Sequence, residues 1–144
     1  MSKVAIGGDH AGFLLKEAIR KWLEVEGHEV KDFGPFSEES SDYPDFVHPV
    51  ASAIESGEFE FGILMCGSGQ GVTITANKHQ GIRAALCWDT DLAEITRKHN
   101  DANILCMAAR WTAHELGKNI ARVFLSTDFE GGRHQRRVDK IKCS

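Results

Sequence analysis

Short apolar runs alternate with amphipathic stretches along the whole chain, and each such pair predicts a β-strand followed by a helix. Strands are expected at residues 4–7, 28–33, 61–66, 82–87 and 102–108. Helices are expected where apolar residues recur three or four positions apart, at 13–26, 46–54, from about 71, 90–99 and 112–124. The last helix is predicted to have Thr112 as its N-cap, with Glu115 completing a capping box.

Five strand–helix units predict the α/β class with a doubly wound, mainly parallel five-stranded sheet, Rossmann-like, and helices on both faces. A helical tail is expected at the C-terminal end, and residues 1–144 are expected to form one domain, because no linker, repeat or low-complexity segment divides them. Ligands of this class bind at the carboxyl ends of the strands. The predicted edge collects four groups, which are Gly8 to His10, Cys66 to Gly71, Asp89 and Arg110.

Composition and charge narrow the classes of partner. The 144 residues are 42% hydrophobic and 26% charged, which suits one filled core. A formal net charge of −4 argues against a general nucleic-acid binder. Residues 133–142 alone carry +4, which leaves −8 on the rest and favours a small, local anion as partner. No apolar run approaches the roughly 18 residues of a membrane span, and no signal-peptide pattern is present, so a cytoplasmic protein without a membrane partner is expected.

Cys66 stands where a predicted strand ends and a loop with glycines at 67, 69 and 71 begins. Glycines allow such a loop to turn several backbone N–H groups toward one point. A thiol beside an anion cradle suits chemistry in which a proton leaves carbon while negative charge grows on a neighbouring oxygen. The alternative is a small buried core residue, which is how Cys87 and Cys106 are interpreted, because both lie inside apolar runs.

The glycine loop lacks the marks of other phosphate-binding loops. Asp89 follows at the spacing of a dinucleotide site, but position 72 is Val where the third glycine would stand. The loop has no Walker lysine, and no arginine lies six positions after Cys66. The chain has no C-x-x-C pair, and the spacing of the histidines at 28, 48, 79 and 114 does not place them on a common helix face, so no metal is predicted.

Several polar residues admit both a structural and a functional interpretation. Asp9 is either an N-cap or a ligand contact, and Ser68 is either a turn residue or a hydroxyl that moves a proton. His99 and Asn100 close a predicted helix, where both are common for structural reasons. Arg133 and Arg137 are four positions apart and would share one helix face. Their side chains are either solvated or clamp a phosphate.

Four separated segments together resemble the type B ribose-5-phosphate isomerase family, which also includes galactose-6-phosphate and allose-6-phosphate isomerases. They are GGDHAGF at 7–13, CGSGQGVTITANK at 66–78, RKHNDANILCMAAR at 97–110 and EGGRHQRRVDKI at 130–141. The resemblance implies an aldose–ketose isomerase that interconverts ribose 5-phosphate and ribulose 5-phosphate through an enediolate. The alternatives are an isomerase of a six-carbon aldose 6-phosphate, a non-catalytic module that binds a nucleotide or sugar phosphate, and a redox-sensing thiol protein.

The same resemblance implies a role for each matching residue. Cys66 would be the base, and Ser68, where the family often has Thr, would assist proton movement between the two oxygens. Asp9 and His99 would contact the sugar and help open its ring. The substrate-binding residues implied are His10, Tyr43, Gly67, Gly69, Gly71, Asn100, Arg110, Arg133 and Arg137, with the phosphate held by His10 and the three arginines.

The family also implies an assembly and a mechanistic branch. In the family, the residues that match His99 and Asn100 reach into the site of a neighbouring subunit, so a homodimer or a dimer of dimers is expected. One branch of the family has Glu six positions after the cysteine, where this chain has Val72, and the branch with a cysteine base is therefore implied. No cofactor is expected, because the electrons of an aldose–ketose conversion stay within the substrate.

Overall fold

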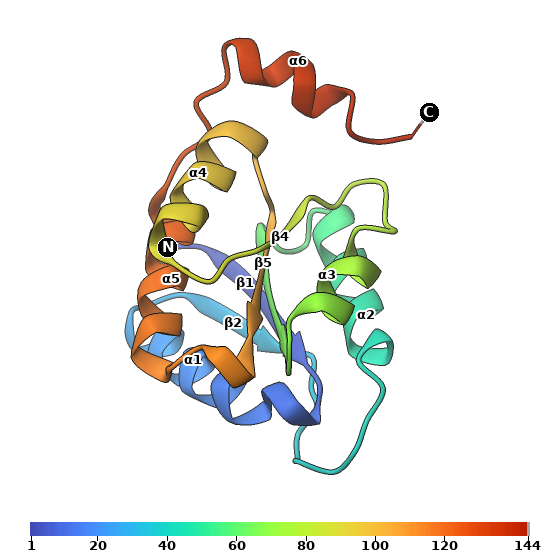
Figure 1. Ribbon diagram of the computed structural model, residues 1–144, viewed down its shortest axis with the longest axis vertical. Coiled ribbons are helices and arrows are strands. Elements are labelled where there is room, and N and C mark those ends of the chain that lie inside the picture. The colour runs from blue at the N-terminus through green and yellow to red at the C-terminus, as the bar shows by residue number, and fades with distance from the viewer. Residues whose placement is uncertain (144) are drawn as a thin grey trace.

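The computed structural model describes residues 1–143. The strands alternate with helices along the chain (Figure 1). The elements are β1 (Lys3–Gly8), η1 (His10–Gly12), α1 (Phe13–Val25), β2 (Glu29–Asp32), α2 (Pro44–Glu55), β3 (Phe61–Cys66), α3 (Gln70–Ala76), β4 (Ala84–Leu86), α4 (Thr90–Asn100), β5 (Ile104–Ala108), η2 (Ala109–Trp111), α5 (His114–Ser126) and α6 (Arg133–Asp139).

All neighbouring strands run parallel, in the order β2-β1-β3-β5-β4. The prediction of a doubly wound five-stranded sheet is confirmed, and the helical tail is α6. From β1 the chain passes to one side to form β2 and then to the other side to form β3, so β1 and β3 flank the point where the strand order reverses. Ligands of this fold class bind at that switch point, beyond the carboxyl ends of the strands.

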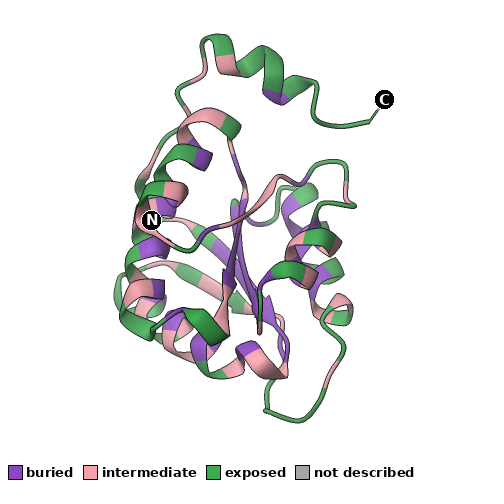
Figure 2. Cartoon of the chain, viewed as in Figure 1, coloured by how far each residue is buried: buried purple, intermediate pink, exposed green. Residues whose placement is uncertain are grey.

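Two apolar clusters hold the helices on the sheet. Alternate residues of a strand point to opposite faces, so Ile63 and Met65 of β3 pack with α1, α4 and α5, while Leu64 and Cys66 pack with α2 and α3. The helices lie on the two sides of the sheet in Figure 1, and Figure 2 shows the central strands as the most continuously buried part. The core therefore fixes the carboxyl ends of β1 and β3 firmly in place.

The predicted capping box at the start of the last sheet-packing helix is wrong. The helix α5 begins at His114, its N-cap is Ala113, and no side chain caps it. Thr112 lies one residue earlier, where its Oγ1 is buried with no hydrogen-bond partner among residues 1–143. Glu115 instead forms an ion pair with Lys118, at 3.0 Å. The N-cap of the helix thus lies one residue beyond the predicted one, and Thr112 is the C-cap of η2 instead of the N-cap of α5.

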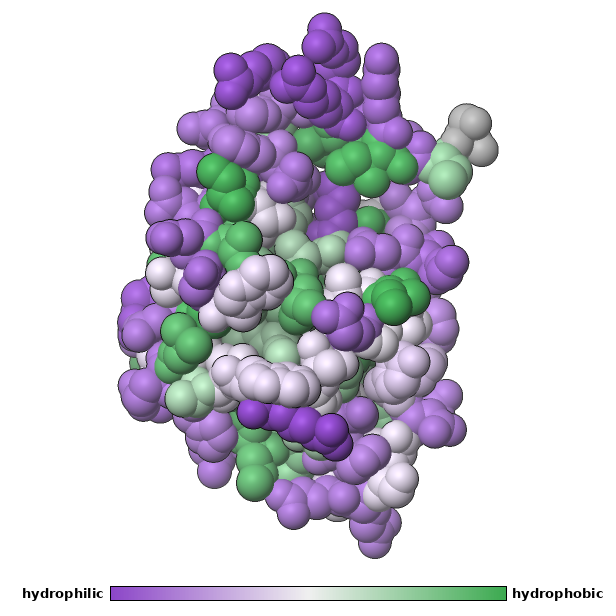
Figure 3. All heavy atoms as spheres, viewed as in Figure 1, coloured by the Kyte–Doolittle hydropathy of each residue, from purple (hydrophilic) through white to green (hydrophobic). Residues whose placement is uncertain are grey.

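The other end of the sheet, where the strands begin, is covered by the end of α4 and by α6. The backbone N–H of Glu130 donates to the carbonyl of Lys98, which ties the segment before α6 to α4. This end is the upper one in Figure 1, and Figure 3 shows mostly hydrophilic residues there. Among the helices of residues 1–143, none has the length and apolar character needed to cross a membrane.

Candidate active site

Cys66 is the last residue of β3, at the edge of the sheet where ligands of this fold class bind. Its neighbour across the sheet is Ala108 of β5. The residue is 5% exposed and shares an apolar cluster with Val72 and Cys106. Gly67 is half-buried and Ser68 is exposed, so the surface is reached within two residues. The side chain of Cys66 is thus buried, and the loop that follows it reaches the surface.

The glycine loop turns sharply between β3 and α3. Gly69 has a φ of +74°, and a side chain there would approach Leu86 and the backbone of Met107 to between 2.5 and 3.0 Å. Ser68 Oγ accepts a hydrogen bond from the backbone N–H of Gln70 at 3.3 Å, so its structural role as a turn residue is realised. The loop is therefore pressed against β4 and β5 at a place where only glycine fits.

Arg110 is brought to this loop, as the predicted edge requires. Its backbone N–H donates to the carbonyl of Gly67 at 3.0 Å, and a Cβ on Gly67 would lie 3.1 Å from the arginine Nε. The guanidinium therefore lies beside the residue that follows Cys66. Asp89, also predicted at this edge, is the N-cap of α4, where its Oδ1 accepts from the N–H of Leu92 at 2.8 Å.

Asp9 and His10 follow β1 and lie next to the end of β3. The backbone N–H of Asp9 donates to the carbonyl of Met65 at 3.2 Å, which holds the two strand ends together. The Asp9 side chain is buried, and its Oδ1 accepts from the N–H of Gly12 at 3.1 Å, so its N-cap role is also realised. The Asp9 turn thus reaches the residue that precedes Cys66.

A residue that the sequence did not single out, Ser41, holds His10. The N–H of His10 donates to Ser41 Oγ at 3.2 Å, and the N–H of Ser41 donates to His10 Nδ1 at 3.1 Å. Since Nδ1 acts as an acceptor, the proton of the neutral ring is on Nε2, which is left as a donor. No sequence signal marks Ser41, because it lies 31 positions from His10 in a loop rich in Ser and Glu.

Tyr43 completes this half of the site. Its ring lies against the first turn of α3, so that a Cβ on Gly71 would be 2.5 Å from the tyrosine Cζ. A cavity of about 670 Å³ opens beside Tyr43 and is lined by Asp9, His10, Ser40, Ser41, Asp42, Tyr43, Pro44 and Asp45. A second cavity, of about 540 Å³, contains none of the predicted residues and has Met1, Trp22, His28 and Arg122 in its lining.

The other predicted site residues lie at the opposite end of the sheet. His99 and Asn100 end α4, only a few residues before Asn103, whose carbonyl accepts from Gly62 near the start of β3. The five residues of β5 then run from this end of the sheet to the other, a length of about 16 Å. Arg133 and Arg137 belong to α6, beside the end of α4. Within one chain, these four residues are therefore separated from Cys66 by the length of a strand.

The ring of His99 stacks on that of His134, with centroids 4.2 Å apart, and Glu130 lies 3.6 and 3.5 Å from their Nε2 atoms. The three side chains offer the donor set of a metal site, with ligand atoms within 4.8 Å of one another. Desolvation, and then the charges of His99 and Arg133, lower the pKa of His134. The arginine charge that disfavours a proton there also disfavours a cation, so we assign no ion to the group.

The four cysteines differ in their surroundings. All are free thiols, and Cys143 is the exposed one. Burial raises the pKa of both Cys87 and Cys106 to about 12, with the Asp89 charge adding to the effect at Cys87. Both thiols therefore stay neutral at physiological pH, in agreement with their interpretation as core residues.

A doubly wound sheet with a thiol, a glycine loop and polar groups at its switch point defines an α/β protein with a candidate ligand site at that point. Comparison with known proteins gives the family. The family described as Ribose/Galactose Isomerase matches residues 4–141. The chain belongs to this family, as the resemblance of its four motifs implied.

Individual relatives are similar over nearly their whole length. Ribose-5-phosphate isomerase B of Escherichia coli (strain K12) is 46% identical over 141 residues, which are 98% of this chain and 95% of the relative. The crystal structure of a ribose 5-phosphate isomerase from Thermotoga maritima superposes with a TM-score of 0.97 at 51% identity, covering 98% of this chain and 97% of that one. The ribose-5-phosphate isomerase B from Mycoplasma genitalium, with bound ribulose-5-phosphate, has a TM-score of 0.92 at 40% identity, covering 96% and 93%.

Proposed function

We propose that this chain is an aldose–ketose isomerase that interconverts ribose 5-phosphate and ribulose 5-phosphate through an enediolate, with Cys66 as the base. The observation that carries the proposal is the position of Cys66. It stands between the glycine loop and the Asp9–His10 turn at the switch point of the sheet, in a chain that belongs to the sugar isomerase family. Residues 1–144 form one isomerase domain in this proposal.

The chemistry assigned to Cys66 balances within the substrate. The Cys66 thiolate takes the proton from C2 of the open-chain aldose, and the C–H electron pair forms the C1–C2 double bond while the C1 carbonyl oxygen becomes an enediolate oxygen. The amides of Gly67, Gly69 and Gly71 hold that oxygen. The cysteine then returns the proton to C1, and Ser68 carries the hydroxyl proton between the oxygens at C2 and C1. No cofactor is required, because the electrons stay within the sugar.

The polar groups near Cys66 suit the binding of the sugar phosphate. His10 presents Nε2–H as a donor because Ser41 occupies Nδ1, and an N–H donor can bind a phosphate oxygen. Arg110, beside Gly67, adds a charged donor, and Tyr43 lines the pocket. Asp9 contacts the sugar and helps to open its ring. Anchoring the phosphate in this way aligns the C–H bond with the sulfur before charge develops.

We infer that a second copy of the chain completes the site. His99, Asn100, Arg133 and Arg137 lie a strand length away from Cys66 of their own chain, which supports a role in a neighbouring subunit. In that arrangement His99 assists ring opening, Asn100 binds an enediolate hydroxyl, and the two arginines hold the phosphate with His10 and Arg110. A homodimer, or a dimer of such dimers, satisfies the arrangement by two-fold symmetry.

The cytoplasm is the compartment proposed for the enzyme, and four free cysteines support a reducing environment. The function is tested by incubating the purified protein with ribose 5-phosphate, allose 6-phosphate and galactose 6-phosphate and measuring the ketose formed. The proposal predicts the highest kcat/KM with ribose 5-phosphate. A clear preference for a six-carbon aldose 6-phosphate would contradict ribose 5-phosphate as the substrate. Binding of a sugar phosphate without any ketose formed would contradict the isomerase activity.

A further inference from the structure

Lys16 is a charged residue that the proposed chemistry does not use, and it is completely buried, at 0% exposure. Its Nζ lies 2.6 Å from Asp32 Oδ2 and 3.2 Å from Glu17 Oε1. The ammonium also lies over the rings of Phe13 and Phe36, 5.2 and 5.7 Å from their centroids. A buried ammonium is tolerated only when such partners replace its water shell. Asp32 is the nearest of the groups that replace the water shell of Lys16.

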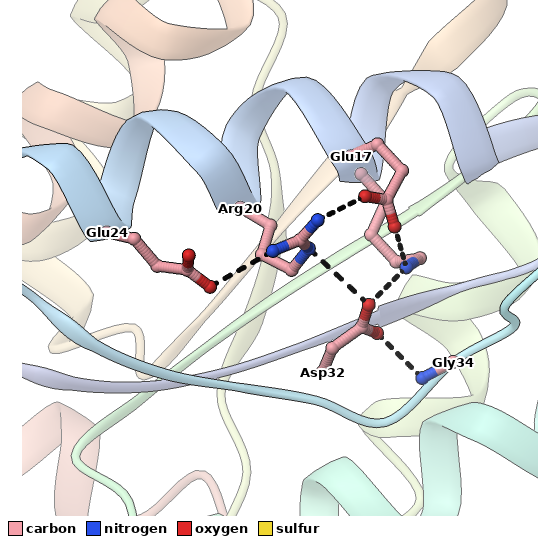
Figure 4. A network of polar contacts seen from close by, with 6 residues as sticks. Glu17, Arg20, Glu24, Asp32 and Gly34 are labelled. Atoms are coloured by element: carbon pink, nitrogen blue, oxygen red, sulfur yellow. Dashed lines mark hydrogen bonds and ion pairs between the residues drawn. The ribbon is translucent and has the colours of Figure 1, made fainter.

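Asp32 uses both of its carboxylate oxygens. While Oδ2 binds Lys16, Oδ1 accepts a hydrogen bond from the backbone N–H of Gly34 at 2.8 Å. Figure 4 shows Asp32 between the side chains of α1 and the N–H of Gly34. Arg20 also reaches Asp32 Oδ2, at the longer distance of 3.8 Å, and continues to Glu24 at the solvent side. The carboxylate thus joins helix α1 to the start of the segment 33–43.

Gly34 links Asp32 to the strand end that carries Asp9. Its carbonyl accepts from the N–H of Gly8 at 3.0 Å, and Gly8 immediately precedes Asp9. Gly34 has a φ of +98°, and a side chain there would meet the ring of Phe46 at 3.0 Å, so glycine is the residue that fits at this position. At the other end of the segment, Ser41 holds His10 by two hydrogen bonds. The segment 33–43 is thus fastened at both ends to the turn that carries Asp9 and His10.

Stability alone does not account for an ion pair that buries the Lys16 ammonium completely and leaves Asp32 14% exposed. Replacing such a pair with apolar residues of similar volume is often neutral or stabilising, because desolvating two charges is costly. An apolar pair, however, offers no acceptor to the N–H of Gly34. What the pair provides is a carboxylate held in one orientation, with one oxygen fixed by the ammonium and the other directed at the backbone.

We propose that Lys16 and Asp32 are positioning residues of the isomerase site: through Gly34 and the segment 33–43, they hold Asp9, His10 and Tyr43 in the geometry that binds the sugar phosphate. The inference rests on the proposed function for its kinetic consequence. Its structural consequence, a segment 33–43 that loosens when the pair is removed, is independent of which reaction the site performs.

Two variants test the proposal. Asp32→Ala removes the acceptor for Gly34 and the nearer partner of Lys16, which keeps only Glu17 at 3.2 Å. The double variant Lys16→Met with Asp32→Asn keeps an acceptor for Gly34 and leaves no unpaired charge. The matched control is Glu24→Gln, which changes the solvent-facing end of the same network, where Glu24 contacts Arg20. For each variant, kcat and KM for ribose 5-phosphate are measured together with hydrogen–deuterium exchange of peptides that cover residues 33–43.

Asp32→Ala is expected to lower kcat/KM about 10- to 100-fold, mainly through KM, and to speed exchange in the segment 33–43. The double variant is expected to lie between Asp32→Ala and the wild type, and Glu24→Gln to match the wild type in both measurements. Wild-type KM together with wild-type hydrogen–deuterium exchange in either folded variant would overturn the proposal. A lower melting temperature would not rescue it if KM and exchange are unchanged. If Asp32→Ala does not fold, the double variant decides alone. A wild-type protein without isomerase activity would contradict the proposed function, while the exchange measurement would still decide the role of the pair.

Discussion

Gly71 and Tyr43 are packed so closely that a single added methyl group on Gly71 would lie 2.5 Å from the tyrosine Cζ. The contact joins the first turn of α3 to the residue just before α2, and Tyr43 also lines the cavity that contains Asp9 and His10. Glycine at position 71 therefore leaves room for a neighbouring side chain and does not serve its own backbone conformation, since its φ lies outside the left-handed region.

Gly71→Ala is expected to raise KM for ribose 5-phosphate, because the added methyl displaces the exposed ring of Tyr43, and to destabilise the protein by about 1 kcal/mol or less, since alanine is favoured in a helix. Thermal or denaturant unfolding gives the free-energy change. The control is the same substitution in a Tyr43→Ala background, where the methyl has room and is expected to cost little. An equal cost in both backgrounds would mean that the ring is not what the methyl meets.

His10 is expected to be in the tautomer that carries its proton on Nε2 when the ring is neutral. The reason is the hydrogen bond from the backbone N–H of Ser41, which occupies Nδ1 at 3.1 Å. Long-range proton–nitrogen NMR correlations of the imidazole distinguish the two tautomers, and the exposed His114 provides the reference for a ring free to adopt either. A dominant Nδ1–H pattern for His10 would contradict both the hydrogen bond and the proposed donation to phosphate.

Alkylation should separate the cysteines by their surroundings. Because burial raises the pKa of Cys87 and Cys106 to about 12, their reactive thiolates form only as the pH approaches that value. Iodoacetamide at pH 7.5, followed by peptide mass spectrometry, is expected to label Cys143 and to leave Cys87 and Cys106 unmodified. Cys66 is expected to be labelled in the free enzyme and protected by ribose 5-phosphate. Labelling of Cys66 that the sugar phosphate does not slow would place the sulfur outside the binding site.

Two inactive variants should restore activity when they share a dimer. Cys66→Ala and His99→Ala change residues that a strand length separates within one chain, so a mixed dimer contains one site with both residues intact. Random assortment of equal amounts is expected to return about a quarter of the wild-type activity, by the two-fold symmetry of the pair. Co-expression of differently tagged chains provides the mixed dimer.

The matched control for this experiment mixes Cys66→Ala with Asp9→Ala. These two residues lie at adjacent strand ends of the same chain, linked through the Asp9 N–H and the Met65 carbonyl. No mixed dimer then has an intact site, and no activity is expected to return. Restoration in the control, or none in the Cys66 and His99 mixture, would refute the shared site.

Sequence pattern predicted much of this architecture because the sheet is parallel. The strand 61–66 lies where its apolar run indicated, and parallel strands bring their carboxyl ends to one edge, so Cys66, Asp9 and Arg110 meet as expected. The contacts of Ser41 and Tyr43 were not predictable, because loop geometry depends on residues far apart in sequence. The prediction of Thr112 as an N-cap was wrong, because the residue types that define a capping box do not show where the preceding helix η2 ends.

The distance between Cys66 and the site residues of α4 and α6 in the same chain could not be predicted from the sequence. The family resemblance assigned roles to His99, Arg133 and Arg137, but a role does not state at which end of its own sheet a residue lies. That follows from the direction of α4, which runs back along the sheet from the carboxyl edge to the start of β5. Only the fold shows that these residues are far from Cys66 of the same chain.

Exchange of the substrate C2 hydrogen with solvent deuterium tests the base most directly. Ribose 5-phosphate is incubated in deuterium oxide with the wild type and with Cys66→Ala, the C2 proton is followed by NMR, and calorimetry measures sugar-phosphate binding. With Cys66 as the base, the wild type exchanges the hydrogen, whereas Cys66→Ala still binds the substrate and exchanges none. Exchange by Cys66→Ala at the wild-type rate would contradict the account.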